Sequence, residues 1–398
     1  MDANQNRMVD IVRAAIVVSF SNLGDSLLYV ALPLIYSSFG LNLVQVGILL
    51  SANRLVRFAS NTLAGYVYGI KPLKWVLVTS IIAAFFINLS YGYIGGFLPF
   101  LTMRLLWGIT WSFLRLGGYL SVVSFSDEFN RGRYMGVYQS ISSIGFLSGG
   151  LVGGVLLDSW GFTSANLLLA LGTFLVIPIA FSLTDKRLDV TQPEYVHKFN
   201  IRTLLGNSEL FSIGVGVMLT RLFLGSLISS TLSLYLIEIL GSEGITFLGW
   251  NVGIASLTGI LLSFRIFIKF LLGPVIGVLS DKFGGQRTMG ILFVSGSASL
   301  MMLAISQSLG IITMAVILSF LSDAGLGVVI ASQVSDMVET GDADSKFTLS
   351  AFTNWIDIGS ALGPLVIFSL ISKISFNSIF VSASAVLLLY ALVIRKAL

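Results

Sequence analysis

The chain has 398 residues, of which 55% are apolar and only 11% are charged. Its mean hydropathy of +0.93 excludes an ordinary soluble fold, whose core could not hold so much apolar surface, and predicts a protein that lies in a bilayer. The net charge of +4 is explained by Lys and Arg in the loops expected on the cytoplasmic side of the membrane. It gives no reason to expect a nucleic-acid partner.

Apolar runs long enough to cross a membrane recur along the whole chain. A helix needs roughly 20 apolar residues to cross about 30 Å of hydrocarbon. The first run exceeds a signal-peptide core and lacks a small-residue cleavage site, so we expect it to stay in the membrane. We predict twelve spans, at residues 9–37, 43–69, 74–93, 98–125, 134–157, 162–183, 210–237, 248–279, 288–307, 309–335, 347–371 and 376–394.

Lys and Arg in the loops predict the orientation of these spans. With the amino terminus in the cytoplasm, Lys373 is the one loop cation placed outside, as the positive-inside rule favours. We therefore expect a multi-pass protein of the cell membrane with both termini in the cytoplasm. The loop cations predicted inside are Arg7, Lys71, Lys74, Arg131, Arg133, Lys186, Arg187, Lys198, Arg202, Lys282, Arg287, Lys346, Arg395 and Lys396.

A polar stretch of mixed charge, residues 185–209, divides the spans into two sets of six and is typical of a solvated linker. This predicts an amino-terminal half over residues 1–184 and a carboxy-terminal half over 210–398. The halves also look like repeats, as is common in secondary transporters. One offset aligns Arg57 with Lys269. A nearly equal offset aligns Gly145 with Gly359.

The loop after the eighth predicted span reads Gly277-Val-Leu-Ser-Asp281-Lys282-Phe-Gly284-Gly285-Gln286-Arg287. It resembles the signature loop of the major facilitator superfamily, G-x-x-x-D-[RK]-x-G-x-[RK]-[RK]. The first copy, residues 65–74, keeps Gly65 and Lys71 but has Gly69 where the acid belongs.

Two further segments are similar to signatures of that family. Arg104-Leu-Leu-Trp107-Gly108 resembles R-x-x-x-G, and residues 145–154 resemble the antiporter pattern G-x-x-x-G-P-x-x-G-G with Gly150 in place of proline. The resemblance covers nearly the whole chain. It implies an all-α integral membrane fold, with twelve transmembrane helices in two pseudo-symmetric six-helix halves.

An acid in a tight cytoplasmic loop can bind a helix amino terminus or a basic side chain, and such contacts break as domains rock. We therefore hypothesise that Asp281 and Arg287 belong to a gate, although the positive-inside rule alone also explains Lys282 and Arg287. The candidate gate and motif residues are Arg57, Gly65, Lys71, Arg104, Lys269, Gly277, Asp281, Lys282, Gly284 and Arg287.

Glycines spaced four residues apart let membrane helices approach closely, so we interpret them as packing positions rather than ligand contacts. We expect Pro364 to add a bend. The packing set is Gly145, Gly149, Gly153, Gly359, Gly363 and Pro364.

Charged residues inside the spans predict a polar pathway, because charge in hydrocarbon costs about 2.5–3.5 kcal/mol or more. They are Arg54, Arg57, Arg104, Arg115, Arg221, Arg265, Lys269, Asp25, Asp323 and Asp357. Cations outnumber acids, so a water-filled cavity holding all of them would attract anions. Arg pairs well with carboxylate or phosphate, which favours an organic anion or phosphate ester as solute.

The predicted solute-binding residues lie on spans that line the central cavity in the superfamily or near its midplane: Asp25, Arg54, Arg115, Arg221, Arg265 and Asp323. The alternative is that several of the Arg residues pair with acids or helix carbonyls and never contact solute. Burial disfavours an ionised carboxyl whereas a nearby Arg favours it, so three acids are candidate proton carriers. Asp25 is the first choice, followed by Asp323 and Asp357.

The composition gives no support for an enzyme. The chain has no Cys, one His in the linker (His197), and no H-E-x-x-H or G-x-S-x-G pattern, so we expect no cofactor and no metal. A channel would repeat its pore lining around an axis instead of forming two halves.

We predict a secondary transporter, working as a monomer by alternating access, that moves a small and anionic organic solute with protons. Membrane lipid is its expected surrounding. Proton-coupled export of drug-like amphipathic compounds is the alternative, and a solute sensor with a transporter fold is an alternative of another class. The sequence leaves the solute, the direction and the stoichiometry open.

Overall fold

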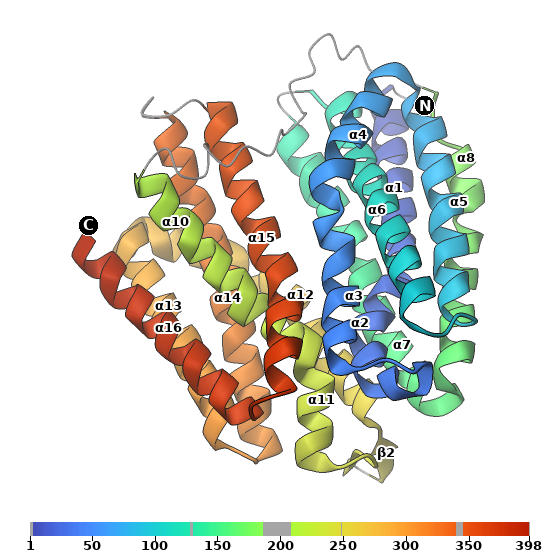
Figure 1. The fold of residues 1–398 in the computed structure, drawn as a ribbon. Coiled ribbons are helices and arrows are strands. Elements are labelled where there is room, and N and C mark those ends of the chain that lie inside the picture. The colour runs from blue at the N-terminus through green and yellow to red at the C-terminus, as the bar shows by residue number, and fades with distance from the viewer. Residues whose placement is uncertain (1–2, 128–129, 186–207, 248, 340–344, 398) are drawn as a thin grey trace. The chain divides into compact units, whose positions relative to one another are not determined.

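The computed structural model describes residues 3–127, 130–185, 208–247, 249–339 and 345–397 (Figure 1). This part of the chain is almost entirely helical. Its one hairpin pairs β1 (Ile245–Phe247) with β2 (Trp250–Val252) in antiparallel register, with Ile245 opposite Val252. Most of the predicted linker, including His197, lies outside the described residues.

The chain folds into two compact units. Unit 1 comprises Met1–Leu41, Ala52–Lys198 and Ser242–Ser263. Unit 2 comprises Asn42–Ser51, Phe199–Gly241 and Phe264–Leu398. Residues 42–51 belong to unit 2 and residues 242–263 to unit 1, whereas sequence order would assign each segment to the opposite half.

The helices of unit 1 pack around α7 and α6. Figure 1 shows α1, α4 and α5 alongside α6, and α1 and α2 also pack on α7. Their bounds are α1 (Ala3–Ser21), α2 (Leu23–Ile35), the 3₁₀ turn η1 (Tyr36–Phe39), α4 (Arg57–Ile70), α5 (Leu73–Tyr91), α6 (Phe97–Phe125), α7 (Arg131–Leu175) and α8 (Ile177–Phe181). Two further helices, α3 (Leu43–Leu55) and α12 (Ile254–Phe283), have residues in both units.

Unit 2 contains the remaining helices, among which α13 packs on both α14 and α16 (Figure 1). Their bounds are α10 (Ser208–Leu219), the π-helical segment η2 (Thr220–Leu227), α11 (Ile228–Leu240), α13 (Gly285–Ile305), α14 (Leu309–Glu339), α15 (Ser345–Ile371) and α16 (Phe376–Ala397).

In the described residues, ten helices are long and apolar enough to cross a membrane. Two breaks reconcile this number with the twelve predicted spans. Gly161 has φ 75° and ψ 173°, a left-handed conformation that favours glycine, and it divides α7 where two predicted spans meet. A break at Val56 separates α3 from α4, which together cover the second predicted span. The architecture is consistent with the twelve-helix, all-α membrane fold.

The glycines of the packing set lie where helices approach closely in each unit. A β-carbon on Gly145 would overlap the Ser19 carbonyl of α1, and one on Gly149 would come within 2.7 Å of the Ser26 side chain. Gly153 packs against leucine side chains.

Unit 2 repeats this arrangement on α15, next to Pro364 in the same helix. A β-carbon on Gly359 would overlap the Met218 carbonyl of α10, and one on Gly363 would overlap the Ser226 side chain. Glycines at equivalent positions thus let the first span of each half pack closely against α7 or α15. The sequence offsets predict this internal symmetry.

Candidate functional site

Three charged side chains from three helices meet in unit 2. Arg221 lies on η2, Arg265 on α12 and Asp323 on α14. Arg221 Nη1 is 2.8 Å from Asp323 Oδ1, while Arg265 Nη2 and Nε are 3.0 and 3.2 Å from Asp323 Oδ2. Both carboxylate oxygens are therefore occupied. One acid balances two guanidinium groups, so this triad carries a net positive charge.

The two arginines of the triad remain partly accessible although the carboxylate is buried. The side chains of Arg221 and Arg265 are 21% and 32% exposed, against 4% for Asp323. Arg221 Nε is buried and has no hydrogen-bond partner among the described residues. Unused donors and surplus positive charge are the features by which proteins recognise a carboxylate or phosphate group.

Two glycines leave room for the triad. A β-carbon on Gly225 would lie 3.0 Å from Arg265 Nη2, and one on Gly327 would lie 3.0 Å from Arg221 Nη2. Gly225 belongs to η2, and π-helical turns occur frequently at functional sites. The absence of side chains at these positions lets both guanidinium groups reach the same carboxylate.

Neighbouring groups extend the triad. The Arg265 guanidinium lies 5.9 Å from the centroid of the buried Phe320 ring, a cation–π contact that supports its orientation. Lys269 on α12 is close enough to interact electrostatically with all three charges of the triad. With Lys269 included, three cations surround one acid.

Unit 1 contains a different charge pair. Asp25 on α2 forms an ion pair with Arg104 on α6, and their side chains are 7% and 0% exposed. The break between α1 and α2 places Asp25 in the first turn of α2, and Asn88 Nδ2 donates to the Ser21 carbonyl beside that break. The first candidate for the proton carrier is thus held by an arginine that sequence analysis assigned to a motif.

The other intramembrane cations of unit 1 lie on α3, α4 and α6. Arg54 lies 5.4 Å from the centroid of the Tyr29 ring, and Arg115 Nη2 is 3.4 Å from Asn61 Oδ1. Arg57 is buried on α4. Among the intramembrane charges named from the sequence, unit 1 also has more cations than acids.

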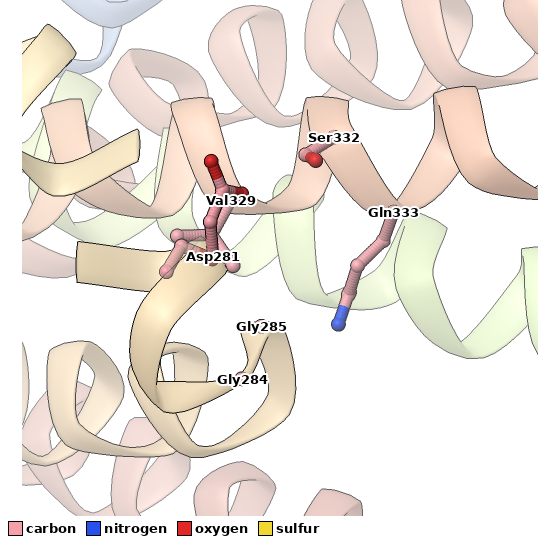
Figure 2. Close-up of a pocket in the computed structure, with 7 residues that line it drawn as sticks. Asp281, Gly284, Gly285, Val329, Ser332 and Gln333 are labelled. Atoms are coloured by element: carbon pink, nitrogen blue, oxygen red, sulfur yellow. The ribbon is translucent and has the colours of Figure 1, made fainter. Parts of the chain in front are cut away.

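The loop that resembles the family signature lines a pocket of about 190 Å³ in unit 2. Figure 2 shows Asp281 at the end of α12, Gly284 and Gly285 at the turn into α13, and Gln333 on the facing α14. Gly284 has φ 89° and precedes α13. The three charged side chains of this signature loop, Asp281, Lys282 and Arg287, are exposed.

The remaining gate and proton candidates lie apart from this pocket lining. A β-carbon on Gly277 would lie 3.7 Å from the Val328 side chain, which is an ordinary contact distance. Lys71 is exposed at the end of α4, Gly65 lies within that helix, and Asp357 is buried on α15. In the described residues, no group of His, Cys, Asp and Glu could hold a metal ion.

Sequence analysis singled out the charges of the triad but not the glycines beside them. Gly225 follows Arg221 by four residues, and Gly327 follows Asp323 by four. Residues four apart share a helix face. A small residue one turn after an intramembrane charge is the signal that would have predicted this arrangement.

A helical bundle with ten candidate membrane spans among the described residues defines a multi-pass membrane protein. The chain belongs to the Major Facilitator Superfamily, because the sequence model of that family matches residues 14–271.

Relatives agree with this assignment. The chain is 23% identical over 340 residues to an uncharacterized MFS-type transporter of Methanocaldococcus jannaschii, covering 82% of each protein. It is 24% identical over 325 residues to multidrug resistance protein MdtG of Salmonella schwarzengrund, covering 81% of this chain and 77% of that protein.

Solved structures share the fold. A bacterial homolog of the human lysosomal transporter Spinster, inward-facing and unoccupied, has a TM-score of 0.72 at 13% identity and covers 98% of this chain and 97% of its own. A peptide transporter POT bound to sulfate has a TM-score of 0.75 at 13% identity, covering 100% and 98%.

Proposed function

We propose that this transporter moves a small organic anion together with protons by alternating access. The observation that carries the proposal is the triad of unit 2, in which Arg221 and Arg265 share the single carboxylate of Asp323. We also propose that it works as a monomer in the cell membrane with both termini in the cytoplasm, as the distribution of loop cations favours.

The triad supplies charge and donors for an anion. Arg presents its N–H groups in a planar fork that matches carboxylate and phosphate. The side chains of Arg221 and Arg265 are partly exposed and keep N–H donors that Asp323 does not use. Lys269 adds positive charge to the same region. A carboxylate or phosphate ester is the solute class that this chemistry recognises.

Asp323 provides a means of coupling to protons. While it is ionised, its oxygens occupy donors of both arginines. A proton on Asp323 removes its negative charge, weakens these bonds and frees the donors for the solute. Proton and anion would then bind together and leave together. Asp25 is less suited to this role, because its partner Arg104 is buried and offers no accessible donor edge to a solute.

The test is proton flux, reported by a dye in proteoliposomes under an imposed pH gradient. The panel comprises mono- and dicarboxylates, phosphate esters, sugars and lipophilic cations. Hydrogen bonds to charged groups contribute about 1.5–3 kcal/mol, so Arg221→Ala and Arg265→Ala should each raise the half-saturating anion concentration by roughly tenfold to a hundredfold.

Lys373→Ala is the matched control, because it removes one exposed cation outside the membrane spans. Its flux should equal that of the unchanged protein. If anion-dependent flux persists with normal half-saturation in both Arg variants, the triad is not the solute site. If no anion on the panel produces flux, the solute class is wrong.

A second function is proton-coupled export of drug-like compounds. The relative named multidrug resistance protein MdtG and the glycine pattern at residues 145–154 favour it. Flux produced only by lipophilic cations, and unaffected by Arg221→Ala, would support this second function over the first.

A further inference from the structure

The carboxylate of Asp158 on α7 accepts hydrogen bonds from the first residues of α12. Asp158 Oδ2 accepts hydrogen bonds from the backbone N–H of Ser256 at 2.7 Å and from its Oγ at 2.5 Å. Asp158 Oδ1 accepts the backbone N–H of Ala255 at 3.3 Å. The first N–H groups of a helix have no partner within it, and a carboxylate there also interacts favourably with the helix dipole.

Close glycine packing continues the same contact along both helices. A β-carbon on Gly154 would overlap the Ala255 carbonyl, and one on Gly259 would overlap the Gly150 carbonyl. Gly253 lies directly against the Asp158 carboxyl group. These backbones approach so closely that no side chain fits between them, and all of these residues lie in unit 1.

The pseudo-symmetric counterpart of this crossing lies in unit 2. Residues 42–51 of α3 pack there, and a β-carbon on Gly47 would lie 2.8 Å from the Pro364 carbonyl oxygen of α15 and 2.8 Å from Phe368 Cβ. Both crossings use glycine. At the α7–α12 crossing, a carboxylate also accepts hydrogen bonds from the helix amino terminus.

We propose that Asp158, with Ser256 and the amide of Ala255, is a latch that holds the start of α12 on α7 and opens during the transport cycle. Because the second and eighth spans each contribute residues to the unit of the opposite half, these segments are the ones that must separate if the halves rock. Asp158 then sets the fraction of molecules in which α12 stays on α7.

The chain has no cysteine, so a single introduced thiol is the one position of the chain that a maleimide can label. Ala255→Cys is a small change at a residue that is 1% exposed. The experiment measures the rate at which a membrane-impermeant maleimide labels this thiol from outside intact cells that express the full chain. No solute is needed, so the outcome is independent of the proposed solute class.

In the Ala255→Cys background, Asp158→Ala removes every hydrogen bond of the latch, and labelling should become about tenfold faster. Ser256→Ala removes one hydrogen bond and should accelerate labelling about threefold. Asp158→Asn keeps one oxygen acceptor but loses the other and the charge, so its rate should lie between these two. Glu238→Ala is the matched control, because it removes an exposed acid at the end of α11.

Surface expression and melting temperature of each variant show whether it is folded. If Asp158→Ala does not fold, Ser256→Ala and Asp158→Asn decide the question. The proposal is wrong if the folded latch variants are labelled at the same rate as Glu238→Ala. It is also wrong if they are labelled more slowly than that control.

Discussion

Asp25 and Arg104 form an ion pair between α2 and α6, and both side chains are buried. They are 79 residues apart in the sequence. The pair fixes the second part of the first span against the fourth span within unit 1. Its burial distinguishes it from the charges of unit 2, where the arginines are partly exposed, and indicates a structural role.

The pair makes a specific prediction about stability. Removing one partner of a buried ion pair leaves an uncompensated charge and costs about 3–5 kcal/mol. Asp25→Asn and Arg104→Met should each lower the melting temperature of the purified protein in detergent. The double variant leaves no lone charge, so it should melt above either single variant. Equal melting of both single variants and the unchanged protein would show that the pair is not structural.

The glycines beside the triad predict a defect in anion recognition. Gly225→Ala and Gly327→Ala each place a carbon 3.0 Å from an arginine nitrogen of the triad, which forces that guanidinium group to move. We expect the half-saturating anion concentration to rise several-fold while the melting temperature changes little, because alanine is a better helix former than glycine.

The control for these substitutions is Gly290→Ala on α13, where an added β-carbon meets no atom within 4 Å. Transport by this control should be unchanged. A normal half-saturating concentration in both triad variants would mean that the guanidinium positions do not matter for the solute.

Asp323→Asn tests the proposed coupling. The amide cannot exchange a proton and carries no charge, so both arginines lose the counter-charge that competes with the anion. We expect solute exchange between two equal pools to continue, while accumulation driven by a pH gradient is lost. The measurement compares counterflow with uphill uptake in proteoliposomes. Undiminished uphill uptake would exclude Asp323 as the proton carrier.

Close packing of α7 on α1 at Gly145 should contribute to the stability of the protein. Gly145→Ala introduces a β-carbon that overlaps the Ser19 carbonyl, and overpacking of this kind costs about 1–3 kcal/mol. The variant should unfold at a lower temperature than Gly136→Ala, which changes a glycine of the same helix in open space. Equal melting temperatures would contradict the packing interpretation.

Much of the fold was predictable because its causes are local in the sequence. The length of apolar runs fixes where spans lie, and glycines at matching offsets marked the packing positions on α7 and α15. The breaks at Val56 and Asn22 were not predicted, unlike the one at Gly161. Val56 and Asn22 interrupt single apolar runs, and hydropathy is the same whether the helix continues through them or not.

The sequence by itself determined that this is a helical membrane protein with charged residues in its spans. Only the tertiary structure decided which of these charges meet. Arg221 and Asp323 are 102 residues apart, and Arg265 and Asp323 are 58 apart. Their contact depends on the rotation and height of separate helices, which helix packing sets and which no local pattern encodes. For the same reason, the latch between Asp158 and Ser256 left no signal in the sequence.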